Sequence, residues 1–394
     1  MVACLYAAAL SYRIYRTRLD IWLPNYAKWA WTSSPAPDKP VHVFLFLTDH
    51  FEPASHPDIV QRWVNEYPRL ANRHRDSNGR PLQHTWFFPV EQMRDEYLLS
   101  LRNLVAAGYG EVELHLHHGN DTWDSALGRY EAGIAYLQKF GFLKTIDNQT
   151  HFAFIHGNNS LDNSRGARFC GVNRELSLLR KLGCFADFTF PNAWDAAQPS
   201  MVNQIYEATD DDRPKSYGTG NSLAMGRPSA GDLTIFTGPL FIRPTLNPRK
   251  LFFEIDNADI HPTYPASETR VDSWVRANIH VGGRPEWVFI KLSGHGAASD
   301  ADADGFLGPA LDRAVSYLES RYNDGRNYVL HYITAREAYN LARAAAAGAK
   351  GDPVQYFDWI VKPYVANGER RTLTGASAQA RQLPRPDRRT PLSP

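Results

Sequence analysis

The chain has 394 residues, which is enough for one large α/β domain or two ordinary ones. Its 43 Lys and Arg are balanced by 42 Asp and Glu, so no overall charge favours nucleic acid or another polyanion as a partner. Cys4, Cys170 and Cys184 are too few for a disulfide framework or a cysteine-based zinc site. The helix expected between Cys170 and Cys184 argues against a bridge between them.

Residues 1–40 are expected to form an N-terminal helix and a proline-rich linker, SSPAPDKP at 33–40. Val2–Leu10 is apolar, but its nine residues fall far short of the roughly 20 that span a bilayer. A basic flank of Arg13, Arg16 and Arg18 follows it. The stretch is therefore either a plain helix, which fits a cytoplasmic protein, or the remainder of a membrane anchor, which fits a periplasmic or membrane-associated one.

Residues 41–350 alternate between strands and helices, which predicts a parallel sheet or barrel. The strands are expected at 41–48, 83–88, 111–117, 151–156, 185–190, 287–292 and 328–333, and the helices at 57–75, 92–107, 125–140, 174–181, 306–322 and 334–347. A less regular stretch at 195–285 carries two further strands, 233–241 and 250–255, that resemble an inserted hairpin. Residues 351–394 form a C-terminal extension whose Arg- and Pro-rich end is expected to be disordered.

The segment EVELHLHHGNDT, at 111–122, is the most informative stretch for function. In a strand, residues two apart point to the same side, so His115 and His117 share one face. His118 begins the loop or turns to the other side. Neutral imidazole is a common ligand for zinc and similar ions, so this strand end is a candidate metal site. The alternative is a polar strand end with solvated histidines.

A second strand end carries similar chemistry. The apolar run Val41–Thr48 is typical of a strand buried on both faces, and it ends at Asp49 and His50. An acid and an imidazole are costly to bury without partners, and active sites of α/β barrels lie at the carboxyl ends of strands. We therefore interpret Asp49 and His50 as functional, with a helix-capping role for Asp49 as the alternative.

Three further strand ends contain histidine. His156 precedes a loop rich in Gly and Asn, which is also ordinary turn chemistry. His295 lies between two glycines after the strand at 287–292 and is a candidate acid or base. His331 lies inside its strand and is more typical of a core histidine.

These strand ends, taken in order, resemble the motifs of polysaccharide deacetylases of the NodB-homology group, in the glycoside hydrolase/deacetylase superfamily. Leu47-Thr48-Asp49-His50 is similar to the Thr-Phe-Asp-Asp motif, and Leu292-Ser293-Gly294-His295 is similar to Leu-x-His with one extra residue. His115 matches the first His of His-(Ser/Thr)-x-x-His, but Gly119 occupies the second position, so His117 or His118 must substitute. No Arg-x-x-x-x-Pro motif is present.

The resemblance covers about residues 41–345. The segments FIHGNNSLDNSR, CGVNRELSLLRKLG, ADFTFPN and LHYITAREAYN resemble an uncharacterised bacterial branch associated with exopolysaccharide loci. The resemblance implies a distorted (β/α)7-type barrel with an inserted irregular or β segment. It also implies a metal-dependent deacetylase that removes N- or O-acetyl groups from a polysaccharide or oligosaccharide.

The resemblance further implies roles for particular residues. A divalent metal, with zinc expected, is held by His50, His115 and either His117 or His118. Asp49 is the base, and His295 protonates the leaving group. The residues expected to bind sugar hydroxyls are Asn158, Asn159, Asp162 and Arg165.

Two other functions stay open from the sequence. A glycoside hydrolase on the same barrel needs two carboxylates, which Asp49 and either Asp121 or Asp162 can supply. A non-catalytic carbohydrate-binding protein of polysaccharide export also fits, because every motif departs from the family pattern.

Overall fold

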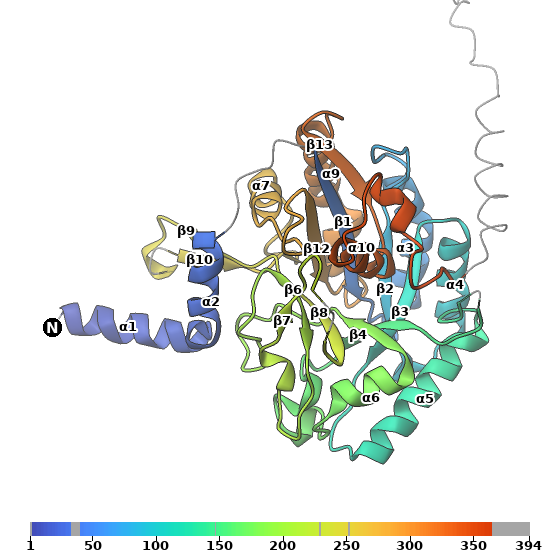
Figure 1. Ribbon diagram of the computed structural model, residues 1–394, viewed down its shortest axis with the longest axis horizontal. Coiled ribbons are helices and arrows are strands. Elements are labelled where there is room, and N and C mark those ends of the chain that lie inside the picture. The colour runs from blue at the N-terminus through green and yellow to red at the C-terminus, as the bar shows by residue number, and fades with distance from the viewer. Residues whose placement is uncertain (1, 33–39, 146, 228–229, 251–252, 365–394) are drawn as a thin grey trace, which may run out of the picture.

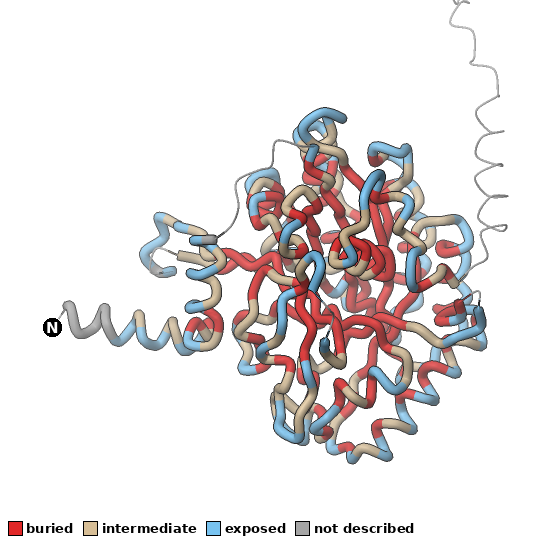
Figure 2. The backbone as a smooth tube through the Cα atoms, viewed as in Figure 1, coloured by how far each residue is buried: buried red, intermediate tan, exposed pale blue. Residues whose placement is uncertain are grey.

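The computed structural model describes residues 2–32, 40–145, 147–227, 230–250 and 253–364. A mostly parallel sheet crosses the body of the molecule, and helices pack around it (Figure 1). The mixed α/β fold expected from the alternating pattern is confirmed. The sheet and the inner faces of the helices form the buried core (Figure 2).

The sheet has the strand order β11-β12-β1-β2-β3-β4-β5-β8-β6-β7, and β13 also pairs with β1. Only β6 and β7 run antiparallel to their neighbours. Its strands are β1 (Val41–His50), β2 (His84–Pro89), β3 (Gly110–Leu116), β4 (Phe152–His156), β5 (Cys184–Asp187), β6 (Gln204–Ala208), β7 (Asn221–Ser222), β8 (Leu233–Thr237), β11 (Asp259–Ile260), β12 (Trp287–Gly294) and β13 (Tyr328–Tyr332). In the described part of the chain, these pairings do not define a closed ring, so the (β/α)7-type barrel stays a prediction.

Strand β1 is the centre of the sheet, because it pairs in parallel with three strands. Nearly all of it, from His42 to Asp49, lies beside β12, its first half pairs with β13, and its last residues pair with β2. Nearly all of its residues are buried, as the apolar run predicts for a strand covered on both faces. This arrangement brings the carboxyl ends of β1, β2 and β12 to one edge of the sheet.

Most of the helices cover the sheet with an apolar face. They are α1 (Val2–Arg16), α2 (Leu19–Thr32), α3 (Pro57–Ala71), α4 (Asp95–Ala106), α5 (Trp123–Lys139), α6 (Glu175–Leu182), α7 (Glu268–Arg276), α8 (Asp300–Leu307), α9 (Pro309–Tyr322) and α10 (Ala335–Ala346). The single helix expected at 306–322 is wrong, because Pro309 cannot continue the hydrogen bonds of α8 and instead starts α9. The expected capping box of Thr334 and Glu337 begins α10.

The N-terminal region forms two helices where one was expected. The chain breaks after α1, near Arg18, whose φ of 49° is left-handed. Helix α1 projects from the body, whereas α2 packs on it through the buried Trp22 (Figures 1 and 2). None of the described helices combines the length and apolar character that a membrane span requires. Nearly all of the expected linker, at 33–39, and the tail, at 365–394, lie outside the described residues.

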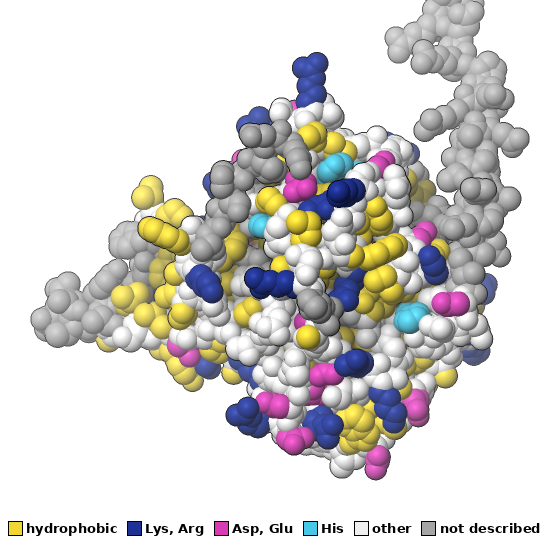
Figure 3. All heavy atoms as spheres, in the orientation of Figure 1, with side chains coloured by type: hydrophobic (Ala, Val, Ile, Leu, Met, Phe, Trp, Pro, Cys, Tyr) yellow, Lys and Arg dark blue, Asp and Glu magenta, His cyan; other side chains and the backbone are white. Residues whose placement is uncertain are grey.

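The segment between residues 195 and 285 differs in detail from its prediction. The strand expected at 233–241 divides into β8, which joins the central sheet, and β9 (Phe241–Pro244). Strand β9 forms the hairpin with β10 (Phe253–Asp256). Figure 3 shows hydrophobic side chains gathered around α2 and this hairpin, and acidic and basic side chains mixed over the rest of the visible face. Cys170 and Cys184 are free and buried, so the bridge between them is absent, as expected.

Candidate metal centre

Histidines from separate strand ends meet at the edge of the sheet formed by β1, β2, β3 and β12. The parallel register places Asp49 beside Gly294 and Pro89 beside His115. As a result, the ring centroid of His50 lies 5.0 Å from that of His115 and 4.5 Å from that of His295. The sequence predicted that these three residues belong to one site, and the structure brings them together.

Glu52 lies among these histidines and was not predicted as a site residue. Its Oε1 is 2.9 Å from Nε2 of His115, 3.5 Å from Nδ1 of His50 and 3.7 Å from Nε2 of His117. We call His50, Glu52, His115 and His117 the Glu52 site. Burial raises the pKa of the Glu52 carboxyl, but the adjacent imidazoles of His115 and His50 outweigh it, and the pKa is lowered overall. Glu52 is therefore an ionised carboxylate.

Two histidines of the Glu52 site, His115 and His117, are oriented by hydrogen bonds from the ring nitrogen that faces away from Glu52. Nδ1 of His115 donates to the carbonyl oxygen of Ile155 at 3.1 Å, and Nδ1 of His117 donates to Oε1 of Glu91 at 2.6 Å. In a neutral ring the proton is then on Nδ1, and Nε2 points a lone pair toward Glu52. A lone pair facing a carboxylate needs a positive charge between them, which is either a proton on the ring or a metal ion.

His50 adds a third nitrogen to this geometry. Its ring is buried, and its Nδ1 makes no hydrogen bond among the described residues. Burial is the main cause that lowers the pKa of His50, which keeps the ring neutral. Buried polar atoms are seldom left unpaired, so an unpaired nitrogen 3.5 Å from Glu52 fits a ligand position. The potential ligand atoms of His50, Glu52 and His115 lie within 4.8 Å of one another.

The position of His117 depends on Gly157, which follows strand β4. A side chain at Gly157 would place its Cβ 2.4 Å from Cγ of the His117 ring. Glycine at this position therefore leaves room for the ring to lie against Glu52 and Glu91. His117 is about one-third exposed, so the Glu52 site opens to solvent on this side.

Asp49, the predicted base, is fully buried, and both of its carboxylate oxygens contact neighbouring groups. Its Oδ1 accepts the backbone N–H of Gly296 at 2.6 Å, and its Oδ2 lies 3.3 Å from Nε2 of His84. Gly296 follows His295, so this contact holds the loop that carries the exposed His295 ring over His50. The carboxylate thus has a positioning role in the structure, and its role as base stays a prediction.

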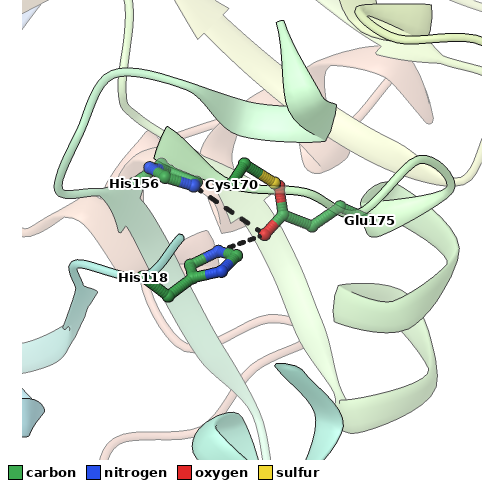
Figure 4. A group of neighbouring side chains, drawn as sticks. All are labelled: His118, His156, Cys170 and Glu175. Carbon is green, nitrogen blue, oxygen red and sulfur yellow. Dashed lines mark hydrogen bonds and ion pairs between the residues drawn. The ribbon is translucent and has the colours of Figure 1, made fainter. Parts of the chain in front are cut away.

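His118 points away from the Glu52 site, because its side chain leaves the chain on the opposite side from that of His117. Its Nε2 lies 2.8 Å from Glu175. His118, His156, Cys170 and Glu175 form a second group, which we call the buried cluster (Figure 4). Of the two histidines predicted as alternatives for the third ligand, the structure places His117 beside Glu52 and His118 in this other cluster.

The four residues predicted to bind sugar lie in the loop after β4, where several of them stabilise the loop itself. The Asn158 amide donates to the carbonyl oxygens of His118 and Phe169. Asp162 is fully buried and accepts the N–H groups of Glu175 and Ser216. The remaining two, Asn159 and Arg165, are partly exposed, and Arg165 pairs with Asp195 at 3.1 Å. Sugar binding by this loop stays a prediction.

A surface depression lies next to the Glu52 site. It has a volume of about 450 Å³ and is lined by Glu91, Met93, Leu116 and Arg129, among others. Glu91 is also the hydrogen-bond partner of His117, so the depression adjoins the site at this side chain. Volumes of this size accommodate small ligands.

Comparison with known proteins leaves the family open. No protein-family model matches the chain. No curated protein matches it either. A solved structure from Parabacteroides distasonis, of a protein named as a candidate glycoside hydrolase/deacetylase, aligns with 76% of this chain and 71% of its own. The identity is 12% and the TM-score 0.40, so this similarity does not define the family or the activity.

Proposed function

We propose that this protein is a metal-dependent hydrolase that removes acetyl groups from a polysaccharide or oligosaccharide. The observation that carries the proposal is the convergence of Nε2 of His115 and His117 on Glu52, with both Nδ1 atoms already bonded to acceptors. This is the arrangement in which metal-binding histidines are held in proteins. The polysaccharide as substrate, and a role in exopolysaccharide synthesis or modification, rest on the sequence resemblance alone.

The donor set fits a divalent ion such as zinc, which takes imidazole and carboxylate ligands and keeps an open position in catalytic sites. His50, Glu52, His115 and His117 would hold the ion. When bound, it would polarise an acetyl carbonyl and lower the pKa of a bound water. The sequence predicted His50, His115 and either His117 or His118 for this role; His117 is chosen and Glu52 is added from their positions.

Proton transfer is assigned to His295 because this exposed residue stacks its ring on His50. The packing of the ring against its neighbours is the main cause that lowers the pKa of His295. A neutral imidazole can accept a proton as water attacks and pass it to the departing sugar oxygen or nitrogen. Asp49 holds the His295 loop through Gly296, and the depression beside Glu91 offers a place for the sugar.

The experiment combines metal analysis with product analysis. Wild-type protein and His115→Ala are refilled with zinc, measured for metal content, and assayed for acetate release from one N-acetylated and one O-acetylated oligosaccharide. We expect His115→Ala to lose one metal equivalent and all acetate release. Retention of the full metal content in His115→Ala would contradict the proposed site.

A glycoside hydrolase is the second candidate, because Glu52 and Glu91 both flank His117 and are partly exposed. Such an enzyme requires two carboxylates at the scissile bond. The carboxylates considered from the sequence fit less well, since Asp162 and Asp121 are buried and bonded within the protein. New reducing ends without acetate would identify this activity in the same assay.

A further inference from the structure

A second set of potential metal ligands lies in the protein interior. The buried cluster brings together His118 after β3, His156 at the end of β4, Cys170 after a short 3-10 turn and Glu175 at the start of α6 (Figure 4). All four side chains are buried, and one ligand atom from each lies within 4.8 Å of the others. None of the four belongs to the Glu52 site.

Neighbouring groups hold His118 and Cys170 in place through hydrogen bonds, as is usual for metal ligands. Nδ1 of His118 lies 3.1 Å from Oδ2 of Asp121, which accepts its proton and leaves Nε2 for the cluster. Sγ of Cys170 accepts two backbone N–H groups, from Asn163 and Val172, both at 3.4 Å. The sulfur in turn lies 3.5 Å from Oε2 of Glu175, so these contacts hold it facing the other ligand atoms of the cluster.

His156 supplies an independent indication. Its ring is fully buried, and its Nε2 has no hydrogen-bond partner among the described residues, although it points toward Oε1 of Glu175 at 3.9 Å. The backbone N–H of Asn158 donates to Nδ1 at 3.2 Å and sets the orientation of the ring. A fully buried nitrogen without a partner is rare, and this one is aimed into a group of metal ligands.

The types of ligand atom in the buried cluster also fit a divalent cation. Two nitrogens, one sulfur and one oxygen suit zinc, and four protein donors with no solvent access define a closed, structural site.

We propose that His118, His156, Cys170 and Glu175 bind a structural zinc ion, separate from the Glu52 site. The ion would join the ends of β3 and β4 to α6 and so fix the loop between β4 and α6. Coordination requires that Cys170 gives up its proton and that the proton of the neutral His156 ring moves from Nε2 to Nδ1, where it replaces the hydrogen bond from Asn158, so binding should release one proton.

Cobalt substitution tests the sulfur ligand in the full-length protein. Cobalt-loaded wild type should show a thiolate-to-cobalt charge-transfer band in the near ultraviolet. Cys170→Ser should lose this band and one metal equivalent, whereas Cys184→Ser, which changes the other buried cysteine in the body of the fold, should keep both. An equal band in wild type and Cys170→Ser would overturn the proposal.

A measurement on the wild type covers the case in which Cys170→Ser does not fold. X-ray absorption at the zinc edge should show sulfur at about 2.3 Å from part of the bound zinc. Zinc with only nitrogen and oxygen neighbours, or protein that binds no zinc after refilling, would overturn the proposal.

The two sites can be tested apart. His115→Ala should lose the metal of the Glu52 site and keep the thiolate-to-cobalt band. Sulfur-bound zinc in a protein that releases no acetate from any substrate would contradict the proposed function and support the structural site. Acetate release that depends on His115, in a protein without sulfur-bound metal, would support the proposed function and contradict the structural site.

Discussion

His117 and His118 are adjacent in the chain, yet their imidazoles belong to different clusters. Nδ1 of His117 lies 2.6 Å from Glu91 at the partly exposed Glu52 site, whereas Nε2 of His118 lies 2.8 Å from Glu175 in the interior. The alternation of side chains at the end of β3 therefore divides one histidine-rich motif between two environments.

The first prediction compares alanine substitutions at these two positions. His118→Ala removes the imidazole nearest to the buried Glu175 carboxylate, which keeps hydrogen bonds from Tyr130 and Asp162, so we expect a loss of up to roughly 3–5 kcal/mol in the free energy of unfolding. His117→Ala removes a partly exposed ring, so it should lower metal affinity and activity with little effect on stability. Denaturant unfolding of the two refilled variants, together with acetate release, measures both effects. Equal losses of stability in His117→Ala and His118→Ala would contradict the assignment of the two histidines to different environments.

The second prediction concerns the residue that orients His117. Glu91→Gln keeps the shape of the side chain but weakens the acceptor for Nδ1 of His117. We expect metal affinity at the Glu52 site to fall by about 10- to 100-fold, measured by competition with a coloured chelator. Glu96→Gln, on the exposed face of α4, is the matched control and should bind metal as the wild type does.

The third prediction tests how Gly296 supports the loop that carries His295. A Cβ at Gly296 would lie 2.6 Å from Oδ2 of Asp49 and 2.7 Å from the Trp63 ring. Gly296→Ala should cost roughly 1–3 kcal/mol of stability and most of the activity, while metal content stays unchanged. Gly128→Ala in α5 meets nothing within 4 Å, so it should be neutral or slightly stabilising.

The fourth prediction separates a structural from a substrate-binding role for Asp162. Its carboxylate accepts the buried N–H groups of Ser216 and Glu175. Asp162→Ala leaves these donors unpaired, so we expect a loss of about 1–3 kcal/mol for each in the free energy of unfolding. KM of the folded fraction should stay constant. A raised KM with unchanged stability would instead support the predicted contact with sugar.

The fifth prediction is a pH dependence remote from both clusters. Burial, followed by the charge of His42, lowers the pKa of His331 to about 3 from its usual 6.5. A lowered pKa gives stability that is complete above pH 6.5 and is lost as the pH falls toward 3. Between pH 7.5 and pH 5 this group should cost up to about 2 kcal/mol. Between pH 7.5 and pH 5, His331→Gln should lose less stability than the wild type. The control His261→Gln, which changes an exposed histidine, should lose as much stability as the wild type.

Most of the fold could be predicted from the sequence, because apolar residues are spaced differently along buried strands and along amphipathic helices. The strand expected at 41–48 corresponds to β1, and the helix expected at 57–75 corresponds to α3. Strand β6 was missed because its sequence, QIYEA, has no clear alternation, and α7 was missed within the irregular stretch.

The site was less predictable, for a physical reason. His50 and His115 could be grouped because parallel strands place their carboxyl ends together, and His295 was added through the resemblance to the deacetylase motifs. Glu52 lies beyond the end of its strand, and Glu175 begins a helix far from His118 in the chain, so no local pattern connects either residue to its histidine. For the buried cluster, the signals available were the backbone alternation that separates His117 from His118 and the position of His156 at the end of a strand.

The pairing of β1 with β12 has a consequence for biosynthesis. Thr48 donates its hydroxyl proton to the carbonyl oxygen of Leu292, 244 positions later in the chain. The ribosome therefore completes most of the polypeptide before the central strand meets this partner, and β13 arrives later still. Contacts between distant segments slow folding, and strand edges that wait for partners invite aggregation. We expect production of this protein to depend on chaperones that shield β1 until the C-terminal third has emerged.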